Sequence, residues 1–263
     1  MIKLIATDMD GTFLDSNKNY DPKFLELFKK MKEKNIHFVV ASGNQCHRLF
    51  QRFESIKEDI YYIAENGSYT LKGSTPLYST LIAPEDLNKL LDMLLPLEDC
   101  FFILSGRKGT HILNKHRNRE DIIVKYYARY YFVENYDDLD DEIFKISLYD
   151  DNHQSTALLE TILPSIPKDV RAITTGHEWI DFTDKSIHKG IALKKLQDDL
   201  GILPEECAAF GDQMNDLELL QQVKYSYAMD NAVDPIKEVA YEIIGDNDSQ
   251  AVIKKIEEIL NNV

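Results

Sequence analysis

Cysteine is scarce in this sequence of 263 residues, and Cys46, Cys100 and Cys207 are odd in number and far apart. Such spacing fits neither a disulfide framework nor a zinc knuckle. We therefore expect free thiols that pack as small hydrophobic side chains.

Long apolar runs are also missing. No stretch approaches the roughly 20 consecutive apolar residues that a membrane-spanning helix needs. The apolar residues at the N-terminus give way to Asp8 and Asp10 too early to form the core of a signal peptide. We expect no membrane contact and a cytoplasmic location.

Positive charge is in short supply, because 30 basic residues face 45 acidic ones and leave a net charge of −15. A protein that binds the nucleic-acid backbone non-specifically would have to overcome this repulsion. We therefore expect no nucleic-acid partner.

Hydrophobic residues, in contrast, make up 44% of the chain, enough for a sizeable core in one large or two smaller domains. Two apolar runs near the N-terminus, residues 3–8 and 36–41, read as buried parallel strands. Between them Asp21-Pro22 predicts a helix start. The apolar residues that follow have helical spacing, at Phe24, Leu27, Phe28 and Met31.

The C-terminal part of the chain repeats this alternation, so both ends belong to one layered α/β domain. Its predicted elements are a helix at 191–200, strands at 207–210, 225–229 and 241–244, and a helix at 250–260.

The middle of the chain has a different pattern of predicted helices and strands, which indicates an α+β insert from about residue 80 to about residue 185. A hairpin around Lys72-Gly73 precedes it. We expect helices at 87–94, 120–130 and 156–163, and strands at 101–104, 111–113, 144–148, 170–174 and 179–182.

Acidic residues follow two of the predicted strands. Asp8-Met-Asp10-Gly-Thr12 ends the first strand, and Gly211-Asp-Gln-Met-Asn-Asp216 follows the strand at 207–210. Ligands of open α/β sheets gather at the carboxyl ends of strands. Two acidic turns in one sheet can share Mg²⁺, which prefers oxygen ligands and often binds substrate phosphate as well.

A phosphate beside these acids would need positive charge and hydrogen-bond donors. Lys189, at a predicted helix start, supplies the charge. The segment Ser42-Gly43-Asn44 directly after a strand supplies a hydroxyl and backbone N–H groups.

These four segments, in this order, resemble the four motifs of the haloacid dehalogenase superfamily of phosphohydrolases, and the resemblance covers essentially the whole chain. The insert and the segment Ala64-Glu-Asn-Gly67 are typical of its Cof-type subfamily, class IIB. The resemblance implies a Rossmann-like parallel-sheet core domain at 1–81 and 185–263, with an inserted α+β cap domain at 82–184.

The resemblance also implies a Mg²⁺-dependent phosphatase in which Asp8 attacks phosphorus and Asp10 acts as the acid and base. The implied roles are catalysis for Asp8 and Asp10; phosphate binding for Ser42, Gly43, Lys189 and Asn215; Mg²⁺ binding for Asp8, Asp10 and Asp212; and support of the metal ligands for Asp216.

Residues 39–45, Val-Val-Ala-Ser-Gly-Asn-Gln, are similar to bacterial Cof-type sugar phosphatases. Sugar phosphates are therefore the leading substrates among small phosphorylated metabolites, with specificity set by the cap. Gln213 and Asn44 depart from the residues that many relatives carry, which affects substrate preference more than reaction type. We expect a monomer or a weak homo-oligomer.

Three alternatives stay open. A phosphomutase of the same superfamily would pass the aspartyl-phosphate to a second sugar position. A receiver-like signalling domain would accept phosphate on an aspartate without needing Asp10 or a cap. A catalytically silent sugar-phosphate sensor would be expected to lack Asp8 or Asp10, and both are present.

Overall fold

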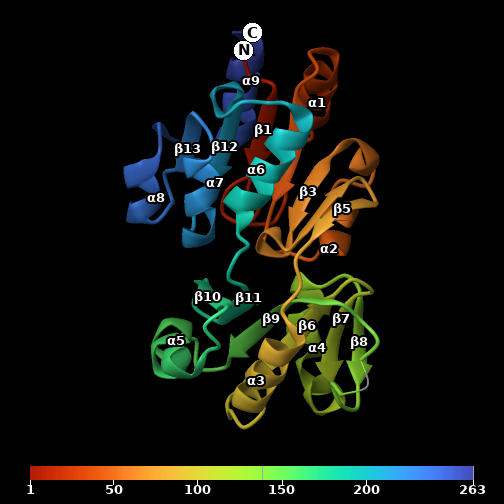
Figure 1. The fold of residues 1–263 in the computed structure, drawn as a ribbon. Coiled ribbons are helices and arrows are strands. Elements are labelled where there is room, and N and C mark those ends of the chain that lie inside the picture. The colour runs from red at the N-terminus through yellow and green to blue at the C-terminus, as the bar shows by residue number, and fades with distance from the viewer. Residues whose placement is uncertain (138, 263) are drawn as a thin grey trace. The chain divides into compact units, whose positions relative to one another are not determined.

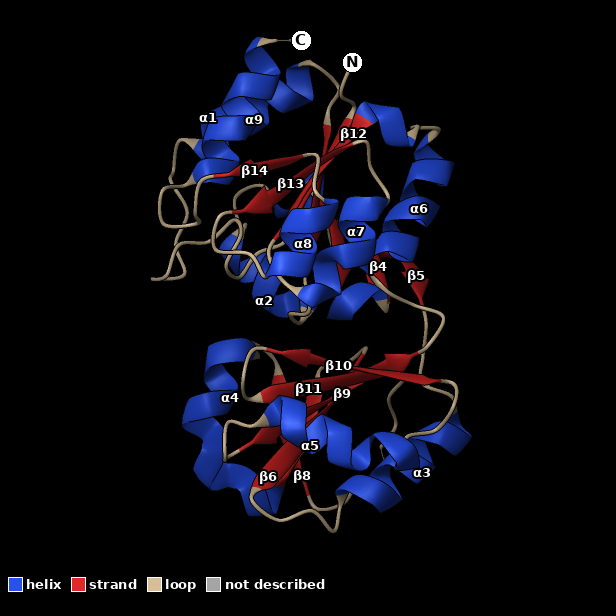
Figure 2. Ribbon diagram, turned by 90° about the vertical axis from the view of Figure 1, so that its left-hand side faces the viewer, coloured by secondary structure: helices blue, strands red, loops and turns tan. Residues whose placement is uncertain are grey.

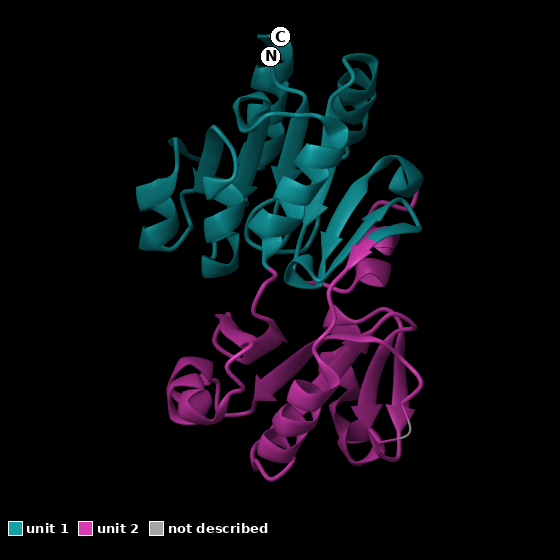
Figure 3. Cartoon of the chain, in the orientation of Figure 1, with its two compact units in different colours: residues 1–43, 56–77, 188–263 teal, residues 44–55, 78–187 magenta. Residues whose placement is uncertain are grey.

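The computed structural model describes residues 1–137 and 139–262; Asp138 and Val263, which fall in the predicted cap and core ranges, lie outside the described residues. The chain divides into two compact units (Figure 3). The first comprises residues 1–43, 56–77 and 188–263, and the second comprises 44–55 and 78–187. Residues 44–55 thus belong to the second unit, although the sequence placed them in the core. The predicted domain limits stay a prediction.

The first unit is built on an eight-stranded sheet in the order β14-β13-β12-β1-β2-β3-β4-β5 (Figure 1). Pairing is parallel from β14 through β3, and β4 runs antiparallel to β3. The strands are β1 (Leu4–Thr7), β2 (His37–Ala41), β3 (Tyr61–Ala64), β4 (Tyr69–Lys72), β5 (Thr75–Ser79), β12 (Cys207–Gly211), β13 (Tyr225–Met229) and β14 (Glu242–Ile244).

Strand β1 lies between β12 and β2, and all four of its residues are buried. This central position follows from its unbroken apolar character, since a strand of a parallel sheet is covered by helices on both faces. The carboxyl ends of β12, β1 and β2 therefore meet at one edge of the sheet.

Helices cover both faces of this sheet, with α1 and α9 together on one side and α6, α7 and α8 in a row on the other (Figure 2). Their bounds are α1 (Phe24–Glu33), α6 (Lys189–Leu200), α7 (Leu217–Gln221), α8 (Asp234–Val239) and α9 (Ala251–Asn261). The spacing that predicted α1 is confirmed, because Phe24, Leu27, Phe28 and Met31 are its buried residues.

The second unit contains a six-stranded sheet in the order β10-β11-β9-β6-β7-β8, antiparallel except where β7 and β8 run parallel. The elements are α2 (Cys46–Arg52), α3 (Pro84–Leu94), β6 (Cys100–Gly106), β7 (Thr110–Leu113), α4 (Glu120–Tyr126), β8 (Tyr130–Val133), β9 (Ile143–Asp150), α5 (Ser155–Ile162), β10 (Val170–Thr175) and β11 (Trp179–Asp184).

Two apolar clusters make the core of this unit. Leu90 and Leu94 of α3 join a cluster with Ile146 of β9, whereas Ile123 of α4 joins another cluster with Trp179 of β11. The mixed sheet with helices agrees with the predicted α+β insert.

One predicted helix is too long. The pattern at 120–130 predicts a helix throughout, but α4 ends at Tyr126 and Tyr130 begins strand β8. Tyr127 is extended, and the N–H groups of Ala128 and Arg129 donate to the side-chain oxygen of Gln45 at 3.2 and 3.0 Å. A contact distant in sequence thus replaces the helical hydrogen bonds.

The three cysteines are free thiols, Cys46 and Cys207 buried and Cys100 partly exposed, as predicted. Within residues 1–137 and 139–262, no helix combines the length and the apolar character needed to cross a membrane.

Candidate active site

The two acidic turns lie next to each other at the carboxyl edge of the first unit's sheet. Strands β1 and β12 pair in parallel with Thr7 opposite Phe210, and the Asp8 N–H donates to the Phe210 carbonyl at 3.0 Å. Asp8 and Asp212, which follow these strands, are therefore held at the same edge.

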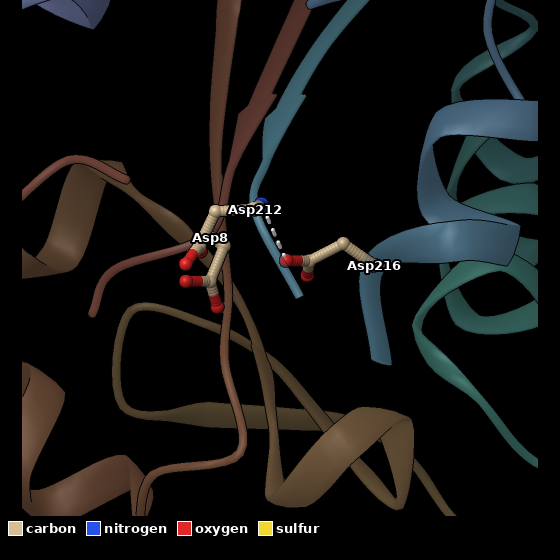
Figure 4. A group of neighbouring side chains, drawn as sticks. All are labelled: Asp8, Asp212 and Asp216. Atoms are coloured by element: carbon tan, nitrogen blue, oxygen red, sulfur yellow. Dashed lines mark hydrogen bonds between the residues drawn. The ribbon is translucent and has the colours of Figure 1, made fainter. Parts of the chain in front are cut away.

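Asp8, Asp212 and Asp216 form a buried group of three carboxylates, each offering an oxygen within 4.8 Å of the others. Figure 4 shows Asp8 beside Asp212, with Asp216 approaching from the segment that follows β12. Asp216 ends the 3-10 helix Met214–Asp216. Its Oδ2 accepts the N–H groups of Asp212 at 3.1 Å and Gln213 at 3.2 Å, which fixes its direction.

Lys189 joins two of these carboxylates. It is the first residue of α6, its side chain is fully buried, and its Nζ lies 2.7 Å from Asp8 Oδ1 and 2.6 Å from Asp216 Oδ1. Burial alone would lower the pKa of Lys189, but Asp216 and Asp8 outweigh it and raise that pKa above its ordinary value. The ammonium therefore stays charged.

Negative charge is in excess here, because three buried carboxylates surround one ammonium. Burial raises the pKa of Asp8 well above its ordinary value, against the lowering effect of Lys189. Burial, followed by the neighbouring Asp216, raises the pKa of Asp212 to about 7. An all-oxygen donor group with uncompensated negative charge fits Mg²⁺.

The turn after β1 is shaped around Asp212. Gly11 has a φ of +81°, and a Cβ there would lie 2.4 Å from Asp212 Oδ2, so only glycine fits. Thr12 Oγ1 donates to Asp212 Oδ1 at 2.7 Å. The sequence reasoning assigned no role to Thr12, although its place in the first motif was a signal.

Asp10 is not part of the carboxylate group. Its partly exposed side chain forms an ion pair with Lys18, with 2.8 Å between Oδ1 and Nζ. In this structure Asp8 pairs with Lys189, whereas Asp10 pairs with Lys18, although both aspartates lie in one turn. Lys18 was not identified from the sequence, since no motif contains it.

The remaining predicted phosphate-binding residues meet around Asn66. Ser42 and Gly43 follow β2, and the Ser42 carbonyl accepts the Asn66 N–H at 3.0 Å. Asn215 Nδ2 donates to Asn66 Oδ1 at 3.1 Å. Asn66 was not among the predicted site residues; its signal was its place in the segment 64–67.

Two curated phosphatases resemble the chain along nearly its full length. A 5-amino-6-(5-phospho-D-ribitylamino)uracil phosphatase of Escherichia coli is 32% identical over 263 residues, covering 99% of this chain and 97% of that protein. A phosphatase of the same description from Bacillus subtilis is 27% identical over 257 residues, covering 97% and 94%.

Solved structures show the same fold. A Streptococcus mutans protein superposes with a TM-score of 0.91 at 30% identity, covering 99% of this chain and 100% of that one. A sugar phosphatase of haloacid dehalogenase subclass IIB superposes with a TM-score of 0.83 at 19% identity, with 98% of each chain covered. The predicted fold class is thereby confirmed. Residues 5–256 match the haloacid dehalogenase-like hydrolases, and this chain belongs to that family.

Proposed function

We propose that this protein is a Mg²⁺-dependent phosphatase that hydrolyses phosphate monoesters of small metabolites through an aspartyl-phosphate. The observation that carries the proposal is the buried ammonium of Lys189, which holds Asp8 at 2.7 Å and Asp216 at 2.6 Å. An orienting cation beside a carboxylate at a strand end suits a nucleophile that attacks phosphorus.

In the first step an oxygen of Asp8 forms a bond to phosphorus, and the bond from phosphorus to the ester oxygen breaks. Asp10 gives its proton to that leaving oxygen. In the second step Asp10 takes a proton from water, whose oxygen attacks phosphorus. The bond between phosphorus and Asp8 breaks, which releases phosphate and restores the carboxylate.

To act as the acid, Asp10 must leave its ion pair with Lys18 and take up a proton from solvent. The two side chains are 39% and 54% exposed, and exposed ion pairs contribute only about 0–1 kcal/mol. Loss of this ion pair by itself therefore costs little free energy.

Phosphoryl oxygens would be held by the hydroxyl of Ser42, the backbone N–H of Gly43, the ammonium of Lys189 and the amide of Asn215. Donors aimed at these oxygens stabilise the charge that spreads over them in the transition state.

Mg²⁺ would be held by Asp8, Asp212 and the backbone carbonyl of Asp10. Asp216 would act from behind these ligands, since its two oxygens already accept bonds from Lys189 and from the N–H groups of Asp212 and Gln213. When bound, the cation supplies positive charge that offsets the repulsion between the Asp8 carboxylate and the phosphate.

Sugar phosphates and phosphorylated sugar alcohols are the substrates we propose. The names of the relatives from E. coli and B. subtilis place the phosphate on a ribityl chain, and one structural neighbour is described as a sugar phosphatase. These substrates share a phosphate monoester on a hydroxylated carbon chain.

The test is phosphate release from a panel of sugar phosphates, ribityl phosphates and nucleotide monoesters with Mg²⁺. Asp8→Asn removes the nucleophile and should lower turnover by at least about 10³-fold. Asp92→Asn makes the same change on the exposed face of α3 and should match the native protein. Full turnover in Asp8→Asn would contradict the mechanism, and transfer of phosphate to a second sugar position would indicate a phosphomutase.

A further inference from the structure

Residues 65–67 form a strained, buried segment beside the site. Glu65, Asn66 and Gly67 follow one another with φ values of +51°, +57° and +108°. Glu65 and Asn66 are 2% and 6% exposed. A non-glycine residue in this region is strained by about 1–3 kcal/mol, and it persists only where its surroundings hold it.

Asn66 connects two segments that are far apart in sequence. Its backbone N–H donates to the Ser42 carbonyl at 3.0 Å, directly after β2. Its side-chain oxygen accepts from Asn215 Nδ2 at 3.1 Å, in the turn after β12. Strand β1, which Asp8 directly follows, lies between β2 and β12 in the sheet. One residue thus ties together the turns on either side of the nucleophile.

This segment packs closely against Gly43 and against the backbone of residues 188 and 189. A Cβ added to Gly43 would lie 2.9 Å from Asn66 Oδ1. A Cβ added to Gly67 would lie 2.7 Å from the His188 carbonyl and 3.2 Å from the Lys189 nitrogen. The segment therefore contacts the backbone next to Ser42 and the start of α6.

We propose that Asn66 is a positioning residue of the phosphate site. An amide nitrogen carries two hydrogens, and the bond to Asn66 directs one of them, which sets the direction of the other. Asn66 thereby orients the Asn215 amide toward phosphate while it holds the Ser42 turn at a fixed distance. The left-handed backbone is needed because it aims both the N–H and the side chain of Asn66 at these partners.

The inference rests on the proposed function, and a double-mutant cycle tests it with p-nitrophenyl phosphate as substrate and Mg²⁺ present. Asn66→Gly removes the side chain, and glycine adopts the left-handed backbone conformation without strain. Asn66→Gly and Asn215→Ala should each lower kcat/KM by about tenfold, the effect of one positioning hydrogen bond. If Asn66 acts through Asn215, the double variant should be no slower than the slower single variant.

Asn35→Gly is the matched control, because Asn35 is exposed after α1 with a φ of +56°. This variant should keep native kinetics, and all variants should keep native circular dichroism spectra. Native kinetics in Asn66→Gly, or losses that add in the double variant, would overturn the inference while leaving phosphatase activity standing.

Binding of inorganic phosphate, measured by calorimetry, separates this inference from the proposed function. If the native protein releases no phosphate from any monoester, the proposed function fails. The binding measurement still decides the role of Asn66. Phosphate binding weakened about tenfold in Asn66→Gly, with no further loss in the Asn215→Ala background, supports it. Native affinity overturns it.

Discussion

Lys189 is the residue on which the charge balance of the site depends. Its side chain is fully buried between Asp8 and Asp216, so Lys189→Met leaves these carboxylates without their cation. Removing one partner of a buried ion pair destabilises proteins by about 3–5 kcal/mol. We expect a loss of this size in the free energy of unfolding, measured with urea, together with loss of phosphatase activity.

Lys194→Met provides the comparison on the same helix. Lys194 forms an exposed pair with Asp198 at 2.8 Å, and exposed pairs contribute at most about 1 kcal/mol. If both variants lost the same free energy of unfolding, the buried ion pair would contribute no more to stability than the exposed one.

Some residues of the site can be predicted from the sequence and others cannot. Asp8, Lys189 and Asp212 stand in short motifs at strand ends and helix starts, so the topology of a parallel sheet brings them together. The partner of Asp10 depends on a lysine eight residues later with a left-handed backbone, φ +64°. Asn66 stands in the segment 64–67, but its role depends on two hydrogen bonds to residues far away in the sequence, which the segment alone does not predict.

Elements were predictable where one face of the element is buried and the other exposed. Helix α1 has this character, and its apolar residues at helical spacing are its buried ones. The prediction of a helix throughout 120–130 was wrong, because the helix ends before Ala128 and Arg129, whose N–H groups donate to the side chain of Gln45. Strand β8 then pairs with β7, and pairing partners distant in sequence decide strand formation more than local preference does.

Helix α2 carries a histidine that should make stability depend on pH. Burial, followed by the nearby Arg129, lowers the pKa of His47 from 6.5 to about 4. Between these values the unfolded chain binds a proton at His47 that the folded chain does not. Unfolding therefore takes up a proton, and stability falls as the pH drops from 6.5 to 4.

His47→Gln removes this proton uptake. We expect the free energy of unfolding of the variant to fall less steeply between pH 6.5 and 4 than that of the native protein. Urea unfolding at several pH values measures the slope. His177→Gln, at an exposed position, should keep the native slope. The same slope in all three proteins would refute the role of His47.

The whole molecule consists of two compact units, each with buried apolar residues of its own. Leu4, Ile5 and Phe24 lie in the first unit, and Leu90, Ile146 and Phe182 lie in the second. The carboxylates of Asp8, Asp212 and Asp216 all belong to the first unit. Mg²⁺ bound to Asp8 and Asp212 should therefore stabilise the first unit directly.

Differential scanning calorimetry with and without Mg²⁺ measures this. A ligand that binds only the folded state at 100 times its dissociation constant contributes about 2.7 kcal/mol. Since about 1 kcal/mol shifts the melting temperature of such a protein by roughly 2–4 °C, the transition of the first unit should rise by about 5–10 °C. The transition of the second unit should stay in place.

Asp212→Asn should remove the shift, because it takes away a carboxylate from the site. Asp92→Asn, an exposed change on α3, should keep it. Chelation of Mg²⁺ from the native protein should return the first transition to its lower temperature. An equal rise in both transitions would contradict a site confined to the first unit. A full shift in Asp212→Asn would contradict the assignment of Asp212 as a Mg²⁺ ligand.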